Sequence, residues 1–513
     1  MRTARFALLI PAVLAAACAS IDFDYPRPET FVPADATHSA LGNEIEALVS
    51  SRKDSLSGFY PVPDGIDALA ARIVMARRAE NTLDVQYYLI YDDIIGRAFA
   101  RELIRAADRG VRVRLLLDDI ITVGLDEGLA LANFHPNIEI RIFNPFRRGV
   151  IGRPISALTD FGRINRRMHN KSFTADNSVT IFGGRNIAAE YFSATEKTHF
   201  GDFDVVAIGP VVREVSRMFD AYWNHEAALP LQAVIKPHKD PENGLKALSD
   251  RLEESYQSIL ISPYANAVKV RVYDYFGENA SRYVWAPHRF VADSPDKGVR
   301  EKASEVKSIV DSLVDSMASA ERKLVLVSPY FVPTDAGLEL FIGLEKRGID
   351  VTIVTNSLAA NNQLTVHGAY ARSRKPLLEA GIEIYEMRRD AAMMGAEYTR
   401  TESTKTTLHT KGFIVDEREV FIGSFNFDPR SAYINTELGV IIQNEDLARV
   451  YSRMVEEQLP THTYKVFLDE NREIRWRGLS NGELVFREKE PDTGWGRRLL
   501  SRVVGWLPLE SQL

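Results

Sequence analysis

The stretch MHNKSFTADNSVTIFGGRN, residues 168–186, decides how the whole chain is interpreted, because its spacing returns in LHTKGFIVDEREVFIGSFN, residues 408–426. In both stretches Asp follows His by seven positions and Asn follows His by seventeen. The paired positions are His169 and His409, Lys171 and Lys411, Asp176 and Asp416, and Asn186 and Asn426. A single His-x-Lys triplet carries no information in a chain of 513 residues, whereas two copies at matched spacing indicate a duplicated unit.

The surroundings of the two stretches repeat as well. Residues 79–83 are echoed by 320–324, and 109–111 by 347–349, at a distance of about 240 residues. Apolar runs of strand length alternate with helical apolar spacing in both halves. A repeat of this length predicts two α/β domains, each with a mixed sheet flanked by helices.

The residue types in the repeat suit cleavage of a phosphodiester. One neutral histidine can attack phosphorus while a protonated histidine supplies the leaving alcohol with a proton, provided that their surroundings push the two pKa values apart. Lys171 and Lys411 would hold the phosphate oxygens. Neither half has two histidines of this kind, so we expect one active site where the halves meet. The other eight histidines show no metal-ligand spacing, and we expect neither a metal nor a cofactor.

The motif resembles that of the phospholipase D superfamily, over residues 66–460. Longer stretches, among them LDVQYY at 83–88, RVRLLLDD at 112–119 and RRMHNKSF at 166–173, resemble bacterial cardiolipin synthases of the C type. The resemblance implies transfer of a phosphatidyl group between lipids through a phosphatidyl-histidine intermediate. It also implies that His169 is the nucleophile and His409 the acid and base.

The resemblance extends to supporting residues. Carboxylates following each motif usually orient the histidines, which implies such a role for Asp202 and Glu437, although Asp204 shares a strand face with Asp202. Asn186 and Asn426 resemble phosphate-contacting residues, and Ser424 either lends a hydroxyl to the site or only packs. Asp176 and Asp416 belong to the catalytic motif, but we expect them to tie down a turn.

Several other polar residues have ordinary explanations. His199 and His367 either line the cleft or are surface or core histidines. The acid pairs 92–93 and 118–119 fit strand ends and turns better than a metal site. The arginine-rich loop at 147–167 either steers anionic headgroups or is a solvated loop.

The N-terminus carries features of a secretory signal. Arg2 and Arg5 precede an apolar run at 6–17, which is too short to span a bilayer as a helix. The only cysteine, Cys18, follows this run and resembles the lipidated residue of bacterial lipoproteins, although Ala15 stands where leucine is usual. Plain secretory cleavage and a retained short anchor are the alternatives. We expect a cell-envelope protein attached to membrane on the periplasmic side, with the outer membrane as one location.

The expected organisation has six parts. They are a signal peptide (1–17), a tether with a helix at 40–51 (18–65), a first phospholipase D-like domain (66–228), an inter-domain insertion (229–318), a second such domain (319–462) and a C-terminal β meander with an amphipathic helix (463–513). The helix at 495–507 has one apolar face, with tryptophan at both ends. It either lies in a membrane interface or packs on the protein.

The resemblance therefore implies a phosphatidyltransferase that makes cardiolipin from phosphatidylglycerol and a second phospholipid such as phosphatidylethanolamine. A hydrolytic phospholipase D and a nuclease share the motif. The net charge of −7 disfavours nucleic acid as a partner, and a non-enzymatic scaffold would not need every catalytic residue twice. The sequence leaves an accessory protein undecided.

Overall fold

The computed structural model describes residues 21–52, 55–122, 124–149, 152–260, 262–274, 282–299, 308–392, 396–480, 482–506 and 512. Cys18 and the expected signal peptide lie outside these residues. In the described part of the chain, no helix combines the length and apolarity needed to cross a membrane.

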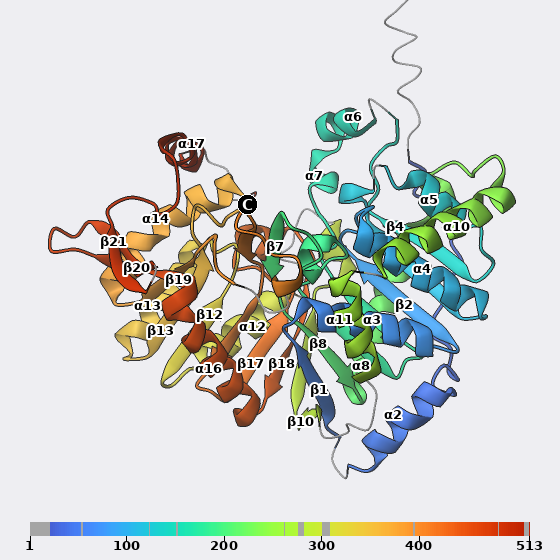
Figure 1. The fold of residues 1–513 in the computed structure, drawn as a ribbon, viewed down its shortest axis with the longest axis horizontal. Helices are drawn as coiled ribbons and strands as arrows, with labels where there is room; N and C mark the ends of the chain where they lie inside the picture. The colour runs from blue at the N-terminus through green and yellow to red at the C-terminus, as the bar shows by residue number, and fades with distance from the viewer. Residues whose placement is uncertain are drawn as a thin grey trace, which may run out of the picture.

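Each half of the chain builds one mixed sheet, and the two sheets lie side by side (Figure 1). The first has the order β10-β1-β8-β6-β5-β2-β3-β4-β9. Its strands are β1 (Ser57–Val62), β2 (Thr82–Tyr87), β3 (Arg112–Asp118), β4 (Ile138–Phe143), β5 (Ser172–Ala175), β6 (Val179–Gly183), β8 (Asp204–Ile208), β9 (Ala228–Pro230) and β10 (Val284–Ala286). β2, β3 and β4 run parallel, and the remaining pairs are antiparallel.

The second sheet repeats this pattern, with the order β11-β18-β17-β16-β12-β13-β14-β19-β20-β21. Its strands are β11 (His288–Ala292), β12 (Lys323–Val327), β13 (Asp350–Asn356), β14 (Glu383–Met387), β16 (Gly412–Val415), β17 (Glu419–Gly423), β18 (Leu438–Gln443), β19 (Thr463–Leu468), β20 (Ile474–Ser480) and β21 (Glu483–Arg487). β12, β13 and β14 are again the parallel strands. The predicted fold class of two mixed α/β units is confirmed.

Helices cover both faces of each sheet. The outer faces pack against α3 (Gly65–Arg78) and α4 (Ile94–Asp108) in the first half, and against α13 (Asp335–Lys346) and α14 (Leu364–Ala380) in the second. The inner faces share one core with α8 (Pro210–Trp223) and α16 (Glu445–His462). Because this core contains apolar side chains from both halves, the halves are joined by a buried surface of the kind found inside a single domain.

Residues 229–318, which the sequence analysis sets apart from both halves, contribute to each of them. β10 pairs with β1 in the first sheet, and β11, only two residues later, pairs with β18 in the second. α10 (Pro241–Ile259) packs on α4, and α11 (Pro263–Asp274) packs on α3. The C-terminal strands β19, β20 and β21 lie within the segment 463–513, where a β meander was expected, and they continue the second sheet through β14.

Asp176 and Asp416 occupy equivalent turns on the far side of the motif strands. Asp176 accepts hydrogen bonds from the backbone N–H groups of residues 80–82, at 2.9–3.1 Å. Asp416 does the same for residues 321–323, at 2.8–2.9 Å. Both have positive φ angles, which aspartate tolerates better than most residues. These bonds fix the start of β2 and of β12, which gives both aspartates a structural explanation.

Candidate active site

Each catalytic motif is fixed in place by the opposite half of the chain. The His169 N–H donates to the Thr436 carbonyl at 3.0 Å, and the His409 N–H donates to the Gly201 carbonyl at 2.7 Å. The short strands β7 (Thr198–Gly201) and β15 (Lys405–Leu408) pair in parallel beside the second motif. Since Gly201 and Thr436 directly precede Asp202 and Glu437, the same backbone contacts bring those carboxylates to the histidines.

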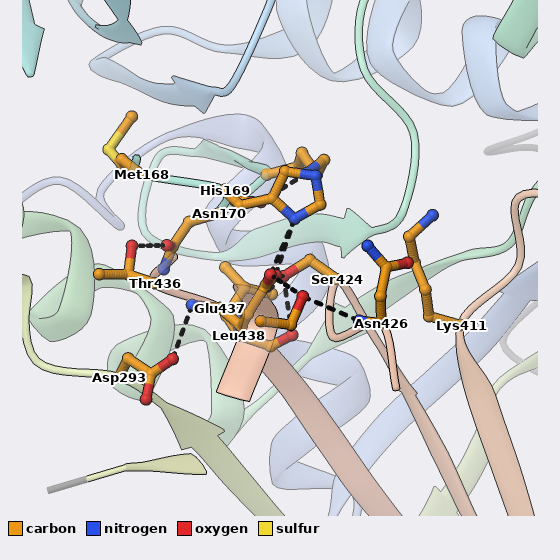
Figure 2. A network of polar contacts seen from close by, with 12 residues as sticks. Met168, His169, Asn170, Asp293, Lys411, Ser424, Asn426, Thr436, Glu437 and Leu438 are labelled. Carbon is orange, nitrogen blue, oxygen red and sulfur yellow. Dashed lines mark hydrogen bonds and ion pairs between the residues drawn. The ribbon is translucent and has the colours of Figure 1, made fainter. Parts of the chain in front are cut away.

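The carboxylates are exchanged between the halves. His169 Nδ1 lies 2.9 Å from Glu437, which belongs to the second half (Figure 2). His409 Nδ1 lies 2.5 Å from Asp202, which belongs to the first half. Both histidines are almost fully buried. The sequence led to both carboxylates but not to the exchange, and Asp204 is instead paired with Arg72.

The two carboxylates differ because one position of the repeat differs. Ser424 Oγ donates to Glu437, and Ser431 Oγ donates to the same carboxylate at 2.7 Å. The position equivalent to Ser424 is Gly184, where an added Cβ would lie only 2.1 Å from Asp202 Oδ1. Glycine therefore lets Asp202 approach closely, whereas serine supplies a hydroxyl for Glu437.

The two carboxylates also differ in charge state, for a different reason. Burial raises the pKa of Glu437 to about 7, although Lys171 and the two serine hydroxyls oppose the shift. Burial also disfavours the Asp202 anion, but Lys411 and His409 outweigh it and lower its pKa to about 2. His409 therefore faces a carboxylate that is ionised throughout the physiological range, while Glu437 beside His169 titrates near neutrality.

Both histidines have lowered pKa values, chiefly because burial penalises the imidazolium and secondly because of the nearby lysines. The value for His409 falls to about 3. Both rings are thus neutral before an anionic ligand binds. Both histidine pKa values shift in the same direction in this state, and a clear asymmetry between the two motifs lies in their carboxylates.

The lysines line the same buried space. Lys171 Nζ donates to the His169 carbonyl and lies 5.3 Å from the Tyr88 ring centroid. Lys411 Nζ donates to the His409 carbonyl and lies 2.6 Å from His409 Nδ1. Burial lowers both lysine pKa values, that of Lys411 to about 8. An anionic phosphate bound beside the two lysines would stabilise their charged forms, which burial disfavours.

Aromatic rings enclose the histidines. The Tyr88 ring meets His169 edge-on at 4.8 Å between centroids. Tyr191 meets His409 edge-on at 4.9 Å, and Phe200 stacks on the same imidazole at 5.4 Å. These contacts fix both imidazole planes while each Nδ1 is held by a carboxylate. The Nε2 atoms are the candidates for chemistry, and that of His409 also lies 3.4 Å from the Tyr191 hydroxyl and 3.3 Å from Lys411 Nζ.

The asparagines of the motif have unused capacity. Asn186 Nδ2 donates to the Tyr191 hydroxyl at 2.9 Å. The side-chain Oδ1 atoms of Asn186 and Asn426 are both buried without a hydrogen-bond partner. Rotation of an amide side chain exchanges its oxygen and its NH₂ group, and the hydrogen-bond partners decide which orientation is adopted. A bound phosphate, which only accepts, would favour the orientation that turns the NH₂ group towards it. Both side chains thus have polar atoms available for a ligand.

Two further acids, Asp118 and Asp293, support the site by accepting backbone N–H groups. Asp118 accepts the Met168 N–H at 2.8 Å and pairs with Arg167 at 3.2 Å. Asp293 accepts the Glu437 N–H at 2.9 Å and pairs with Lys297 (Figure 2). In the sequence analysis, Asp118 is assigned to a strand end or turn and is given no role at the motif. Asp293 lies in the segment without a repeat, and no sequence signal points to it.

The remaining candidates have structural partners. His199 bonds to Thr195 and Thr399, and His367 lies near Glu490. In the loop 147–167, most arginines bond to groups of the protein itself, including Arg148 to Asp119 and Arg163 to Asn144. Among the described residues, no group of three His, Cys, Asp or Glu side chains is arranged to hold a metal ion.

Comparison with known proteins identifies the family. The family described as "Cardiolipin synthase, PLD-like domain" matches residues 73–223 and 313–459. The chain belongs to this family. It is 40% identical to cardiolipin synthase C of Escherichia coli K12, over 88% of this chain and 95% of the relative. It is 25% identical to a cardiolipin synthase of Halalkalibacterium halodurans, over 80% of this chain and 68% of that one.

A solved structure supports the fold independently. The phosphatidylserine synthase of Haemophilus influenzae superposes with a TM-score of 0.57 over 92% of this chain and all of that one, at 14% identity. The matched family regions contain all the motif residues of both halves. The members of this family are phosphatidyltransferases of the phospholipase D superfamily, and this chain is an enzyme of that kind.

The lysine pKa values predict the pH dependence of this cardiolipin synthase family member. Lys411 is charged below pH 8 and neutral above it, so kcat/KM should fall above a midpoint at or below about pH 8. The fall should be weaker in kcat, because bound phosphodiester stabilises the charged lysine. Profiles of both constants would test this, with the exposed Lys246→Ala as control. A kcat/KM that stays constant to about pH 10, the ordinary range of lysine, would contradict it.

Proposed function

We propose that the chain is a phosphatidyltransferase that makes cardiolipin. One substrate would be phosphatidylglycerol, and the other a second phosphatidylglycerol or phosphatidylethanolamine. The observation that carries the proposal is the pair of His–Lys motifs, complete in both halves, whose histidines are oriented by exchanged carboxylates. The family membership of the chain supports the phosphatidyl group as the transferred unit.

In the first step, His169 Nε2 attacks phosphorus, and the phosphorus–oxygen bond to the leaving alcohol breaks. His409 gives the proton of its Nε2 to that alcohol. The phosphodiester anion offsets the lysine charges and raises the pKa of His409, which takes up a proton from solvent as the substrate binds. The ionised Asp202 stabilises the resulting imidazolium. Lys171 and Lys411 neutralise the phosphate oxygens as charge builds on them.

In the second step, the hydroxyl of the acceptor lipid loses its proton to His409 Nε2 and attacks the phosphatidyl-histidine. The new phosphorus–oxygen bond forms as the phosphorus–nitrogen bond to His169 breaks. His409 thereby regains the proton that it gave up, and His169 returns to the neutral form. Proton loss and gain balance on His409 over the two steps, and the proton taken up on substrate binding returns to solvent when the product leaves.

The two histidines are expected to be indispensable. His169→Ala and His409→Ala should each lower activity by about 10³-fold or more, since nucleophile and acid act as a unit. The partly exposed His238→Ala serves as the control and should retain activity. Substantial turnover by either catalytic variant would refute the mechanism. Purified His409→Ala should also accumulate phosphohistidine at His169, and an adduct on His409 in the His169→Ala protein would reverse the assignment.

Transfer and hydrolysis differ in the compound that accepts the phosphatidyl group. On vesicles of phosphatidylglycerol, we expect the enzyme to yield mainly cardiolipin and glycerol, because lipid hydroxyls are concentrated at the surface where the enzyme works. Thin-layer chromatography of radiolabelled lipid would separate cardiolipin from phosphatidic acid. Phosphatidic acid as the chief product would make the protein a hydrolytic phospholipase D.

We also propose that the protein is attached to the membrane on the periplasmic side of the bacterial envelope through lipidated Cys18. The motivating feature is the lone cysteine at the end of the apolar run. Metabolic labelling with a fatty-acid analogue should mark the wild-type protein and not Cys18→Ala. An unlabelled wild type recovered in the soluble periplasmic fraction would point to ordinary signal cleavage. A protein that is recovered together with the enzyme in the same preparations would be a candidate accessory protein.

A further inference from the structure

Helix α17 (Trp495–Gly505) packs on the rest of the protein through the small residues of the helix. Ser501 and Gly505 are its buried positions, and they pack on Gly368 of α14. A Cβ added at Gly368 would lie 2.6 Å from the Ser501 carbonyl oxygen, so the two helices touch backbone to backbone. Val504 of α17 is partly buried, whereas five other large apolar side chains of the helix and its C-cap are exposed.

Those large side chains point away from the protein. Their exposed fractions are 75% for Trp495, 53% for Leu499, 50% for Leu500, 52% for Val503 and 86% for Trp506. Their helical spacing places them on one continuous face, and Arg502 is exposed beside them. An apolar face of this size with tryptophan at both ends is unusual for a surface that meets only water.

A second apolar feature lies in the first half. α6 (Gly152–Thr159) and α7 (Phe161–Ile164) expose 86% of Leu158 and 54% of Phe161. Arg153 fixes α6 by donating to the carbonyls of Asp119 and Ile120, at 2.7 and 2.9 Å. The exposed Leu158 therefore belongs to a helix that is held in place by hydrogen bonds to the protein.

The two features lie on one side of the molecule (Figure 1). Gln512, which follows α17, accepts a hydrogen bond from Asn165 at the end of α7, at 2.6 Å. Phe23, five positions after Cys18, lies 4.9 Å from the guanidinium of Arg163 on α7. Residues from both ends of the chain therefore reach the same side as α7.

Each feature is also linked to one catalytic histidine. Asn165 is four positions before His169. α17 is linked to His409 by a chain of contacts. Arg497 of α17 donates to the carbonyl of Asn361, and the neighbouring Asn362 accepts a hydrogen bond from the Tyr330 hydroxyl at 2.7 Å. The Tyr330 ring in turn lies 6.4 Å from the His409 ring. On their shared side of the molecule, α17 lies over the second half and α6–α7 over the first (Figure 1), with the catalytic pair between them.

We propose that the exposed apolar side chains of α17 and α6–α7 form one docking face that seats the enzyme on a phospholipid bilayer with the active site between its two parts. The lipid character of the substrate rests on the proposed function. Burial of five large side chains on α17 would favour partition into the interface, and Arg502 suits anionic headgroups. A tether at Cys18 would leave the chain on this same side, close to Phe23.

Site-specific labelling tests the face without using turnover. In a Cys18→Ser background, which removes the only cysteine and any acyl tether, Leu499→Cys and Leu158→Cys would carry an environment-sensitive fluorophore. Val450→Cys on α16 and Phe486→Cys on β21 are matched controls, since both side chains are 59% exposed. Vesicles of phosphatidylglycerol should shift the emission at 499 and 158 to the blue and shield both from aqueous iodide. The controls should not change.

Three outcomes would overturn the proposal. A shift at 499 without one at 158 would mean that α17 docks alone. Equal shifts at all four positions would mean unspecific adsorption. A shift that depends on protein concentration and needs no vesicles would identify the face as a contact between copies of the chain. Because none of these readouts involves catalysis, failure of docking is distinguishable from failure of the synthase assignment.

Turnover supplies a second readout. Leu499→Glu and Leu158→Glu should each lower turnover on vesicles by about tenfold, the factor expected when one leucine loses its apolar surroundings. Turnover on detergent-dispersed lipid should stay unchanged, because neither residue belongs to the catalytic site. Val450→Glu should behave as wild type on both substrates. Equal losses on vesicles and in detergent would show that the substitutions damage the fold and not the docking.

Discussion

The hydrogen bonds that cross between the halves, His169 to Glu437 and His409 to Asp202, are the constraint on which the rest of the structure depends. Each histidine takes its orienting carboxylate from the other half, so neither half could hold a working imidazole by itself. The shared core of α8, α16 and both inner sheet faces has to be rigid for the same reason. A shift between the halves would break both pairs at once, and each break would leave a buried polar group unpaired.

Duplication produced two similar halves, but the two orienting carboxylates differ in their surroundings and in their pKa values. Gly184 admits Asp202 closely, whereas Ser424 gives Glu437 a hydroxyl. The ionised Asp202 favours a protonated His409, as a proton donor requires. Glu437, with its pKa raised to about 7, gives His169 weaker support for a positive charge, which suits a neutral nucleophile. The assignment of roles thus has a physical basis in the carboxylates, independent of which motif comes first.

The sequence was most informative where spacing carries the signal. The repeat of His409 and Lys411 at the distance set by His169 and Lys171 predicted the duplication, and alternating apolar runs predicted the sheets. Contacts between segments that are far apart in the sequence produce no comparable spacing pattern. The exchange of Asp202 and Glu437, and the support of Glu437 by Asp293, follow from how two folded halves pack. The division of residues 229–318 between both sheets was equally hidden, because edge strands of three to five residues have too little pattern to recognise.

Water remains the competitor that a transferase of this chemistry has to exclude. It is present at about 55 M in bulk and can attack the same phosphatidyl-histidine as a lipid hydroxyl, so an acceptor wins only through high local concentration or a dry site. The aromatic walls formed by Tyr88, Tyr191 and Phe200 reduce the space for water around both imidazoles. They cannot close the side through which lipid enters. If α17 and α6–α7 rest on the bilayer, the membrane itself closes that side, and the surface that delivers the acceptor also excludes the water that would replace it.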